Sequence, residues 1–351
     1  MPAGWQEQAR PCGAFRRARN IPNPAVLLRV LLVHLAGGDS LRQTAAYARH
    51  AGWCSLSAVD LLRRLRSAES WLRWLADGVR QPHHAPPLRR GWRVRAVDAT
   101  AVQRPGSTGT DWRIHYAVNL EDLQCDHFEL TDCKGGETFR RIPVSPGDVL
   151  VGDRAYGTPP GVGAVAQAGG HVLVRVNHTA LPLFKPSGAP LGLRTRLAAL
   201  TLGRIGQWPA VVHHDGGERP GRLIAVKRSA WAAALERRAL QKRAGKKQKS
   251  VSKRASFLAG YFYVWTDTPE EILEPAGVLE WYRCRWQIEL CFKRMKSILG
   301  LGDLPKKTDA SCRAWLHGKM LVALLLERIL HEAEAFSPWG YELGRPAQPL
   351  A

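Results

Sequence analysis

Apolar residues in the first eighty positions recur at helical spacing and predict three helices, at about residues 24–36, 40–50 and 57–78. Ser40 is suited to cap the second helix, and Ser55 or Ser57 to cap the third. The third helix carries Arg63 and Arg64. Helix, short turn and helix with arginines is compatible with a helix-turn-helix-like DNA-binding unit, and equally with a plain helical bundle whose arginines face solvent.

The middle of the chain changes to strand-like patterning. Apolar runs bounded by turn residues predict a helix near 160–168 and strands at about 92–102, 111–120, 125–133, 148–153 and 171–177. This order is that of an α/β fold with a ribonuclease H-like mixed sheet core. The first and fourth strands of such a core would bring Asp98 and Asp153 side by side.

Far more residues separate Asp153 from the next helical segment than one crossover needs. We therefore predict an inserted β-rich subdomain at 178–268, with strands at about 208–214, 221–228 and 260–266. The run 236–254 within it has nine cations and one acid. Such a run is typical of a solvated or disordered segment, or it supplies phosphate neutralisation in a DNA-handling enzyme.

The segment 279–300, LEWYRCRWQIELCFKRMKSILG, has two stripes when drawn as a helix. The apolar stripe is Ile288, Phe292, Met295 and Leu299. The polar stripe holds one acid among cations, in the set Tyr282, Arg285, Glu289, Lys293 and Lys296. The simple interpretation is i,i+4 ion pairing on an exposed helix. The rings of Tyr282 and Trp286 beside positive charge instead favour contact with a phosphodiester and a splayed base.

Two further acids follow strand-like runs. A carboxylate among DNA-binding cations would repel DNA unless a metal lay between them. Asp98 and Asp153 would reach the ends of their strands, where a Mg²⁺ ion held by few carboxylates can share phosphate oxygens. By itself, each aspartate is better explained as a turn residue at a strand end.

The three acids together, with their neighbours, resemble the DDE transposases of the insertion sequence 4 family. The family's Y-x2-R-x3-E-x6-K signature is matched without a gap by Tyr282, Arg285, Glu289 and Lys296. Asp98 stands in a D-x-T context, as in the first acidic motif, and the run GDRAY at 152–156 is similar to the second. The resemblance covers about residues 38–300, and it tips the N-terminal helices toward binding DNA ends.

The resemblance implies a DDE-type DNA transposase, a metal-dependent polynucleotidyl transferase and endonuclease. Asp98, Asp153 and Glu289 would hold two Mg²⁺ ions, for which Mn²⁺ can substitute. The implied steps are binding of terminal inverted repeats, strand nicking, a hairpin intermediate and joining to target DNA. Predicted DNA contacts include Tyr282, Arg285, Lys293, Lys296, Arg154, Arg63 and Arg64.

Two tryptophans are candidates for stacking on a flipped base. Trp265 lies in an aromatic strand-like run, where a tryptophan is more often a core residue. In relatives that make hairpin ends, a tryptophan of the insertion stacks on such a base, because a flipped base needs a ring to lie against. Trp265 is our first candidate and Trp286 the second.

The charge, the apolar runs and the cysteines limit the kinds of partner and cell compartment that we expect. The net charge is +21 from 51 Lys and Arg against 30 Asp and Glu, which indicates a polyanion. The longest apolar run is too short and too interrupted to span a bilayer, and the N-terminus lacks a secretory pattern, so we expect DNA and no membrane. Seven cysteines without C-x2-C pairing suit a reducing cytoplasm and argue against structural zinc. We predict a cytoplasmic, nucleoid-associated bacterial protein.

The predicted boundaries complete this picture. We expect a basic arm at 1–20, a helical DNA-binding domain at 21–80, a linker at 81–91, a catalytic core at 92–177 and 269–335, and a tail at 336–351. A helix at about 309–334 would cover the sheet or contribute to a dimer, and synapsis of two DNA ends requires at least a homodimer.

Three other functions stay open. One is a transposase-derived protein that binds DNA without cutting, although a pure binding module needs none of the acids. Another is a ribonuclease H-like nuclease without strand transfer, which would use the same catalytic residues. The third, a basic membrane-surface protein, would need a cationic amphipathic helix that the sequence lacks.

Overall fold

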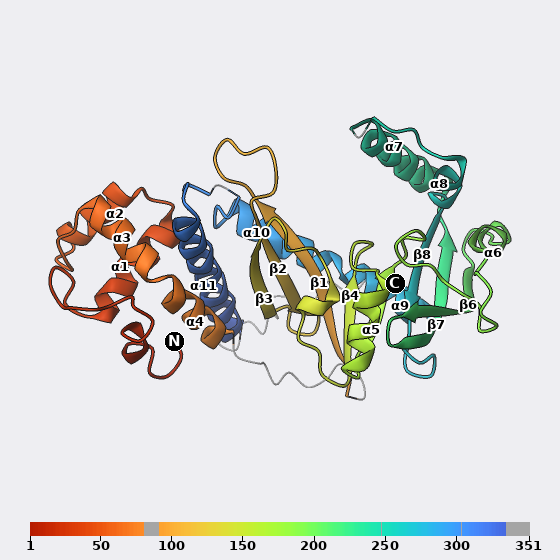
Figure 1. The fold of residues 1–351 in the computed structure, drawn as a ribbon, viewed down its shortest axis with the longest axis horizontal. Coiled ribbons are helices and arrows are strands. Elements are labelled where there is room, and N and C mark those ends of the chain that lie inside the picture. The colour runs from red at the N-terminus through yellow and green to blue at the C-terminus, as the bar shows by residue number, and fades with distance from the viewer. Residues whose placement is uncertain (81–90, 247, 303, 335–351) are drawn as a thin grey trace. The chain divides into compact units, whose positions relative to one another are not determined.

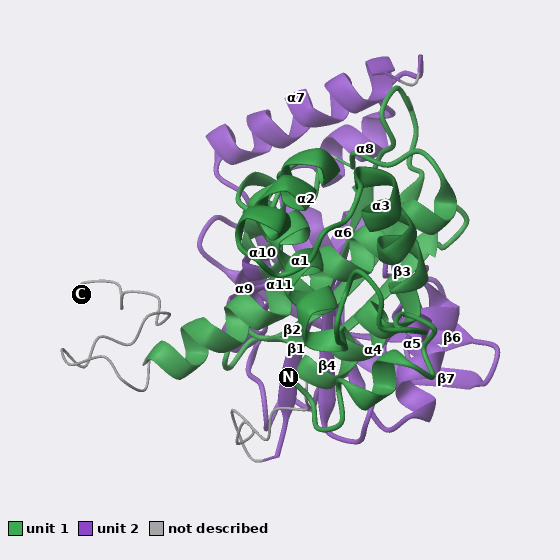
Figure 2. Cartoon of the chain, turned by 90° about the vertical axis from the view of Figure 1, so that its left-hand side faces the viewer, with its two compact units in different colours: residues 1–85, 99–136, 288–351 green, residues 86–98, 137–287 purple. Residues whose placement is uncertain are grey.

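The computed structural model describes residues 1–80, 91–246, 248–302 and 304–334 (Figure 1). The predicted tail at 336–351, and all of the predicted linker except Gly91, lie outside these residues. The contacts divide the chain into two compact units (Figure 2). Unit 1 comprises residues 1–85, 99–136 and 288–351, and unit 2 comprises residues 86–98 and 137–287. Each unit combines segments that are distant in sequence, so neither coincides with a predicted domain.

Four N-terminal helices of unit 1 form one bundle with the last described helix, which contacts three of them directly. They are α1 (Pro24–Gly37), α2 (Leu41–His50), α3 (Ala58–Ser67) and α4 (Glu69–Val79), and the last helix is α11 (Asp309–Glu334). Helix α11, dark blue in Figure 1, contacts α1, α3 and α4. Leu316 and Leu321 of α11 and Trp71 of α4 have no exposed surface. The predicted N-terminal helices therefore share one core with a helix from the other end of the chain.

Polar side chains begin these helices at the predicted positions. Ser40 and Gln43 form a reciprocal capping box at the start of α2. Ser57 Oγ accepts a hydrogen bond from the Asp60 N–H at 3.0 Å at the start of α3. The predicted helix at 57–78 is instead two helices, because the turn tightens at Ala68, whose N–H bonds to the carbonyls of both Arg64 and Leu65.

The first twenty residues differ from the predicted loose basic arm. They include a 3₁₀ helix, η1 (Glu7–Ala9), and Phe15 is only 2% exposed. The ring of Trp5 stacks on Trp71 with centroids 6.1 Å apart, and Trp71 Nε1–H donates to the Trp5 carbonyl at 2.9 Å. The apolar residues scattered among the arginines thus hold this segment against the helical core.

The strands of unit 1 form an antiparallel pair beside the end of β1 (Arg93–Val102). They are β2 (Trp112–Asn119) and β3 (Cys125–Asp132), in the order β3-β2-β1. Helix α11 also contacts β3, as expected of a helix that covers the sheet. Glu327 of α11 accepts hydrogen bonds from the Tyr116 hydroxyl at 2.8 Å and the Cys125 N–H at 3.2 Å. This buried carboxylate ties the helix to both strands.

Unit 2 contains the first half of β1 and two strands parallel to it. They are β4 (Asp148–Gly152) and β5 (His171–Arg175), with helix α5 (Pro159–Gln167) between them and the 3₁₀ helix η2 (Phe139–Arg141) before them. Asp148 is 2% exposed and pairs with Arg93 at 2.7 Å and Arg95 at 3.0 Å. These ion pairs link the starts of β1 and β4 and hold the register that positions the strand ends.

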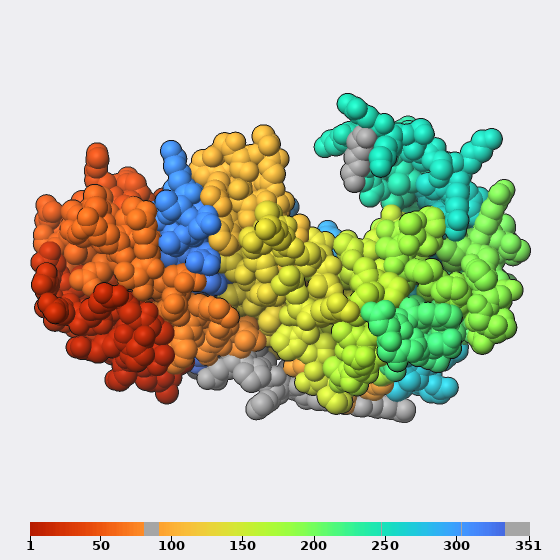
Figure 3. All heavy atoms as spheres, in the orientation of Figure 1, coloured from red at the N-terminus to blue at the C-terminus, as the bar shows by residue number. Residues whose placement is uncertain are grey.

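The segment predicted as an insertion extends the same sheet. It contains α6 (Leu193–Ala198), β6 (Ile205–His214), β7 (Gly217–Lys227), α7 (Ala230–Lys246), α8 (Lys253–Leu258) and β8 (Tyr261–Thr266). Strand β8 pairs antiparallel with β5, so unit 2 has the strand order β1-β4-β5-β8-β7-β6. Helices α7 and α8, in teal, project from this part of unit 2 (Figures 1 and 3). The basic run is therefore mostly helical.

The predicted signature helix is interrupted. Its residues form α9 (Pro275–Cys284) and α10 (Trp286–Ser297), and Arg285 stands at the junction. The Arg285 N–H bonds to the Tyr282 carbonyl at 3.2 Å, three residues back rather than four, so the turn tightens there. Within the described part of the chain, no helix has the length and apolar character needed to cross a membrane.

Candidate active site

Asp98 and Asp153 belong to neighbouring parallel strands of unit 2. Ala96 of β1 lies opposite Val151 of β4, so two further residues along each strand bring Asp98 level with Asp153. Parallel strands lie about 4.8 Å apart, so two side chains at the same level are close neighbours. Both aspartates are half-buried, and Asp153 Oδ1 accepts the Ala155 N–H at 2.7 Å in the turn after β4. The register therefore brings the two predicted acids to one edge of the sheet.

Arg285 lies against the first of these acids. Its Nη1 is 3.4 Å from Asp98 Oδ2, and the side chains of Arg285 and Asp98 are 15% and 20% exposed. The contact joins the helix junction to the middle of β1, 187 residues away in sequence. Asp98 was predicted at a strand end, but β1 continues to Val102 because the alternating pattern extends past it. The sequence predicted both residues as site residues but gave no reason for a direct pair.

Tyr282 is packed beneath this edge rather than exposed on it. It is 8% exposed, and its ring lies 5.2 Å from the ring of Phe262 on β8 and 5.8 Å from the Arg285 guanidinium carbon. Burial raises the pKa of the Tyr282 phenol, while the nearby Arg285 and Arg175 cations counteract part of that rise. The hydroxyl is therefore a neutral hydrogen-bonding group at physiological pH.

The other predicted residues of the signature lie on α10. Glu289, Lys293 and Lys296 are exposed, and Trp286 is 49% exposed. Glu289 belongs to unit 1, whereas both aspartates belong to unit 2. Three residues of the apolar stripe are buried as predicted, Ile288, Phe292 and Met295, while Leu299 lies beyond the end of α10 and is half-buried. The Phe292 ring lies 5.8 Å from the ring of Tyr116.

The donor chemistry of the aspartate pair fits a divalent metal ion. Carboxylate oxygens are the ligands that Mg²⁺ prefers, and an ion held by few of them keeps positions for water and phosphate. In the structure the charge of Asp98 is balanced by a guanidinium, which indicates a site that needs positive charge. Among the described side chains, no three His, Cys, Asp or Glu lie close enough together to hold a metal.

Trp265 does not present a stacking surface in this structure. It has no exposed surface, and its Nε1–H donates to the Ala210 carbonyl at 2.9 Å. The core interpretation of this residue therefore applies: β8 is an interior strand between β5 and β7, and the Trp265 side chain is fully covered. A base cannot reach this covered ring, so we remove Trp265 from the DNA-contact set and keep Trp286.

The predicted N-terminal arginines differ in exposure. Arg63 has a side chain 73% exposed and pairs with Asp60 at 3.5 Å, while Arg64 is half-buried. Neither arrangement distinguishes a DNA-binding surface from a solvated bundle. Their role in DNA binding stays a prediction.

A cluster of arginines beside Asp153 was missed except for Arg154. The guanidinium groups of Arg154, Arg175, Arg228 and Arg243 surround the carboxylate of Glu236 on α7. Arg175 and Arg228 also lie 5.5 and 5.6 Å from the Phe262 ring centroid. The sequence offered two signals for the others: Arg175 lies in the predicted strand at 171–177, and Arg243 belongs to the basic run 236–254.

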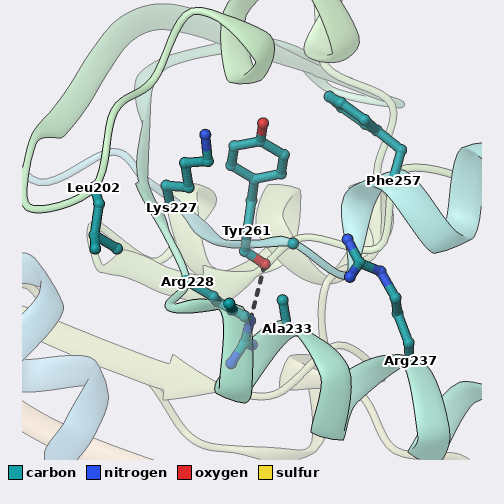
Figure 4. Close-up of a pocket in the computed structure, with 9 residues that line it drawn as sticks. Leu202, Lys227, Arg228, Ala233, Arg237, Phe257 and Tyr261 are labelled. Carbon is teal, nitrogen blue, oxygen red and sulfur yellow. Dashed lines mark hydrogen bonds between the residues drawn. The ribbon is translucent and has the colours of Figure 1, made fainter.

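A pocket of about 470 Å³ lies next to this cluster under α7 (Figure 4). Its lining combines cations with rings: Lys227, Arg228, Arg237, Phe257 and Tyr261. Arg228 Nε–H donates to the Tyr261 carbonyl at 3.2 Å, and the rings of Phe257 and Tyr261 are 5.2 Å apart. Rings and cations are the side chains that hold nucleic-acid strands.

Comparison with known proteins identifies the family. Residues 90–326 match the transposase DDE domain family. The chain is 32% identical over 344 residues to the InsL protein of insertion sequence element IS186A from Escherichia coli strain K12, covering 96% of this chain and 93% of InsL. It is also 32% identical over 345 residues to the transposase for insertion sequence element IS421 from Escherichia coli, with the same coverage.

A solved structure, the cryo-EM piggyBac transposase synaptic complex with hairpin DNA, aligns with 94% of this chain and 79% of that chain. Its sequence identity is 10% and its TM-score 0.43, a likeness too weak to carry an argument. The family match and the two bacterial relatives each extend over most of this chain. The chain therefore belongs to the DDE transposases, metal-dependent enzymes that cleave and transfer DNA.

Proposed function

We propose that the protein catalyses cut-and-paste transposition of an insertion sequence by two-metal phosphoryl transfer. It binds terminal inverted repeats, nicks the strand at each end, passes through a hairpin intermediate and joins the ends to target DNA. The observation that carries this proposal is the β1–β4 register, which brings Asp98 level with Asp153 beside Arg285. The strand orders β3-β2-β1 and β1-β4-β5, with β1, β4 and β5 parallel, support a ribonuclease H-like core for this chemistry.

The carboxylates define where reaction takes place. Asp98, Asp153 and Glu289 would hold two Mg²⁺ ions, and bound ions of this kind supply an activated attacking oxygen and charge stabilisation of the leaving oxygen. Three carboxylates provide negative charge for two dications while leaving positions for the substrate. The half-burial of both aspartates limits competing water at the sheet edge.

The basic and aromatic residues orient the DNA strand. Arg285 faces Asp98, so its guanidinium stands where a phosphodiester must approach the acid and can donate charge-assisted hydrogen bonds to it. Tyr282, held beneath it as a neutral phenol, supports that guanidinium through its ring. Lys293 and Lys296 of α10 are exposed and suited to neutralise neighbouring phosphates, and half-exposed Trp286 is suited to stack on an unpaired base.

Assembly and location follow from the same function. Transposition needs two DNA ends held together, so we propose a homodimer in the synaptic complex. Arg63 and Arg64 of the N-terminal helices would contribute to recognition of the terminal repeats. The chromosome is the target, which makes a cytoplasmic, nucleoid-associated location the expected one.

The test is cleavage of a labelled duplex that carries the element's terminal repeat, with Mg²⁺, Mn²⁺ or EDTA. We expect metal-dependent nicking at the repeat boundary, and a loss of at least about 100-fold in Glu289→Gln, since a missing carboxylate removes several kcal/mol of charge stabilisation. Glu280→Gln, an exposed acid on α9, is the matched control and should cleave like the wild type. DNA binding without cleavage in all three proteins would refute the catalytic assignment.

A second assay separates a transposase from a nuclease. Pre-cut ends are incubated with a plasmid target, and joined products are measured. Joining that requires Glu289 supports strand transfer. Efficient nicking with no joining would instead identify a nuclease of the same fold.

A further inference from the structure

Helix α7 carries one acid among many cations, and that acid faces inward. Among its 17 residues only Ala233 is buried, while Trp231 is 73% and Leu235 43% exposed. The Glu236 side chain is 18% exposed, and Arg237 and Arg238 next to it are exposed. Apolar burial therefore contributes little to holding α7, and the contacts of Glu236 become important for its position.

Four arginines converge on this one carboxylate, three from strand ends of unit 2 and one, Arg243, from α7 itself. Glu236 Oε1 lies 3.7 Å from Arg154, 3.6 Å from Arg175 and 3.3 Å from Arg243, and Oε2 lies 4.0 Å from Arg228. Arg154 follows β4, Arg175 ends β5 and Arg228 follows β7. These distances are long for ion pairs with carboxylates, which are usually about 2.7–2.9 Å. The carboxylate occupies the centre of the cluster without closing tight contacts.

The cluster has more positive charge than Glu236 can balance. Burial lowers the pKa of Arg175 and of Arg228, and the neighbouring Arg154 cation lowers both further. Arg154 Nε and Arg175 Nη2 are buried and have no hydrogen-bond partner among the described residues. Donors with this geometry, around one small anion, match a phosphate group, which offers more acceptor oxygens than a carboxylate.

The cluster lies one contact away from the proposed catalytic residues. Arg154 is the residue after Asp153. Phe262 connects Arg175 and Arg228 on one side to the ring of Tyr282 at 5.2 Å on the other. A strand whose scissile phosphate reached Asp153 would therefore carry a neighbouring phosphate toward these arginines, since a DNA strand carries one phosphate per nucleotide at close spacing.

We propose that Arg154, Arg175 and Arg228 form a binding site for a phosphate of the DNA strand next to the scissile bond, and that Glu236 occupies this site until DNA displaces it. The inference rests on the proposed function, because it names a further DNA contact of the same site. Glu236 acts as an internal substitute for the phosphate and pins α7 over the cluster. When DNA enters, the released helix keeps its exposed cations available for the flanking backbone.

The test compares Glu236→Gln with Glu218→Gln, measuring DNA affinity by fluorescence anisotropy over a range of salt concentrations. Both substitutions raise the net charge by one, and the Glu218 side chain is 64% exposed with His213 as its ion-pair partner, so it controls for charge alone. We expect Glu236→Gln to bind about three- to ten-fold more tightly than Glu218→Gln. The slope of log Kd against log salt should match that of Glu218→Gln, because the arginines contact the same phosphate in both complexes.

A double substitution distinguishes competition from a folding effect. Arg175→Gln should weaken binding more in the Glu236→Gln background than in the wild type, because only there is the arginine available before DNA arrives. Thermal unfolding of each variant reports whether the fold is kept. Equal affinities of Glu236→Gln and Glu218→Gln, or weaker binding by a folded Glu236→Gln, would overturn the inference while wild-type cleavage still supported the proposed function. Absence of DNA binding in every protein would instead refute the proposed function.

Discussion

Helices α11 and α7 each turn one glutamate inward, and they do so in opposite surroundings. Glu327 of α11 accepts hydrogen bonds from neutral donors, Tyr116 and Cys125, and burial raises its pKa. Burial acts in the same direction on Glu236 of α7, but the combined charges of Arg175, Arg154 and Arg228 outweigh it and lower its pKa. The first acid serves the packing of a core element. The second acid only partly neutralises a cluster of arginines, which leaves positive charge for an external anion. The difference between the two glutamates distinguishes a structural contact from a binding surface.

The largest effect should come from the apolar side of α11. Leu321→Ala removes a side chain with no exposed surface, which we expect to cost about 2–5 kcal/mol of unfolding free energy through lost burial and a cavity. Leu235→Ala on α7, where the side chain is 43% exposed, should change it by no more than about 0.5 kcal/mol. Urea denaturation followed by circular dichroism measures both. Similar losses in the two variants would show that α7 is a core element after all.

Low pH should destabilise the core around α11. The titrating group is His34 on α1, a helix that packs on α11. His34 is 4% exposed, its Nδ1 lies 2.9 Å from the Asp39 carbonyl and its Nε2 lies 3.2 Å from Lys306 Nζ. Burial, and then the charge of Lys306, lower the pKa of His34 from 6.5 to about 4. The unfolded chain therefore binds a proton at His34 more tightly than the folded protein does. The contribution of neutral His34 to the unfolding free energy is complete above pH 6.5 and decreases as the pH falls toward 4.

The expected loss is about 3 kcal/mol between pH 6.5 and 4, at about 1.4 kcal/mol per unit of pKa difference. His34→Gln should remove this part of the pH dependence. Unfolding free energies of the wild type and the variant are compared at pH 7 and pH 4.5, so that all other titrating groups cancel. If the unfolding free energies of the two proteins differed by the same amount at pH 7 and at pH 4.5, His34 would not be a buried neutral histidine.

A further loss of stability is expected at Glu327, whose carboxylate accepts two hydrogen bonds. Glu327→Ala leaves the Tyr116 hydroxyl and the Cys125 N–H without their acceptor, and each unsatisfied buried group costs about 1–3 kcal/mol. Glu332→Ala, on the same helix with a side chain 58% exposed and paired with Arg328, should cost less than about 1 kcal/mol. Because the folded pKa of Glu327 is raised, wild-type stability should also fall as the pH rises from 4.5 through that pKa, and Glu327→Gln should not show this loss.

Local pattern by itself determined most elements and the chemistry of the chain. The start and end of α11 and the strands from β1 to β5 agree with the predictions to within two residues, because their apolar spacing is unambiguous and their caps and turns are local. The same spacing placed Asp153 directly after a strand, where it lies, whereas Asp98, also predicted at a strand end, lies within β1. Charge excess and the signature around Glu289 indicated a DNA-handling enzyme, and the family match agrees.

Only the tertiary structure decided which distant residues meet. The pair between Arg285 and Asp98 joins residues 187 apart, and the tightened turn at Arg285 is not encoded by any helix-breaking residue. The burial of Trp265 depends on β8 adding to the edge of β5, and the convergence on Glu236 depends on three strand ends and a helix from the insertion. Periodicity reports how one segment divides between core and solvent, whereas such contacts arise from the packing of segments whose separation in the chain carries no local signal.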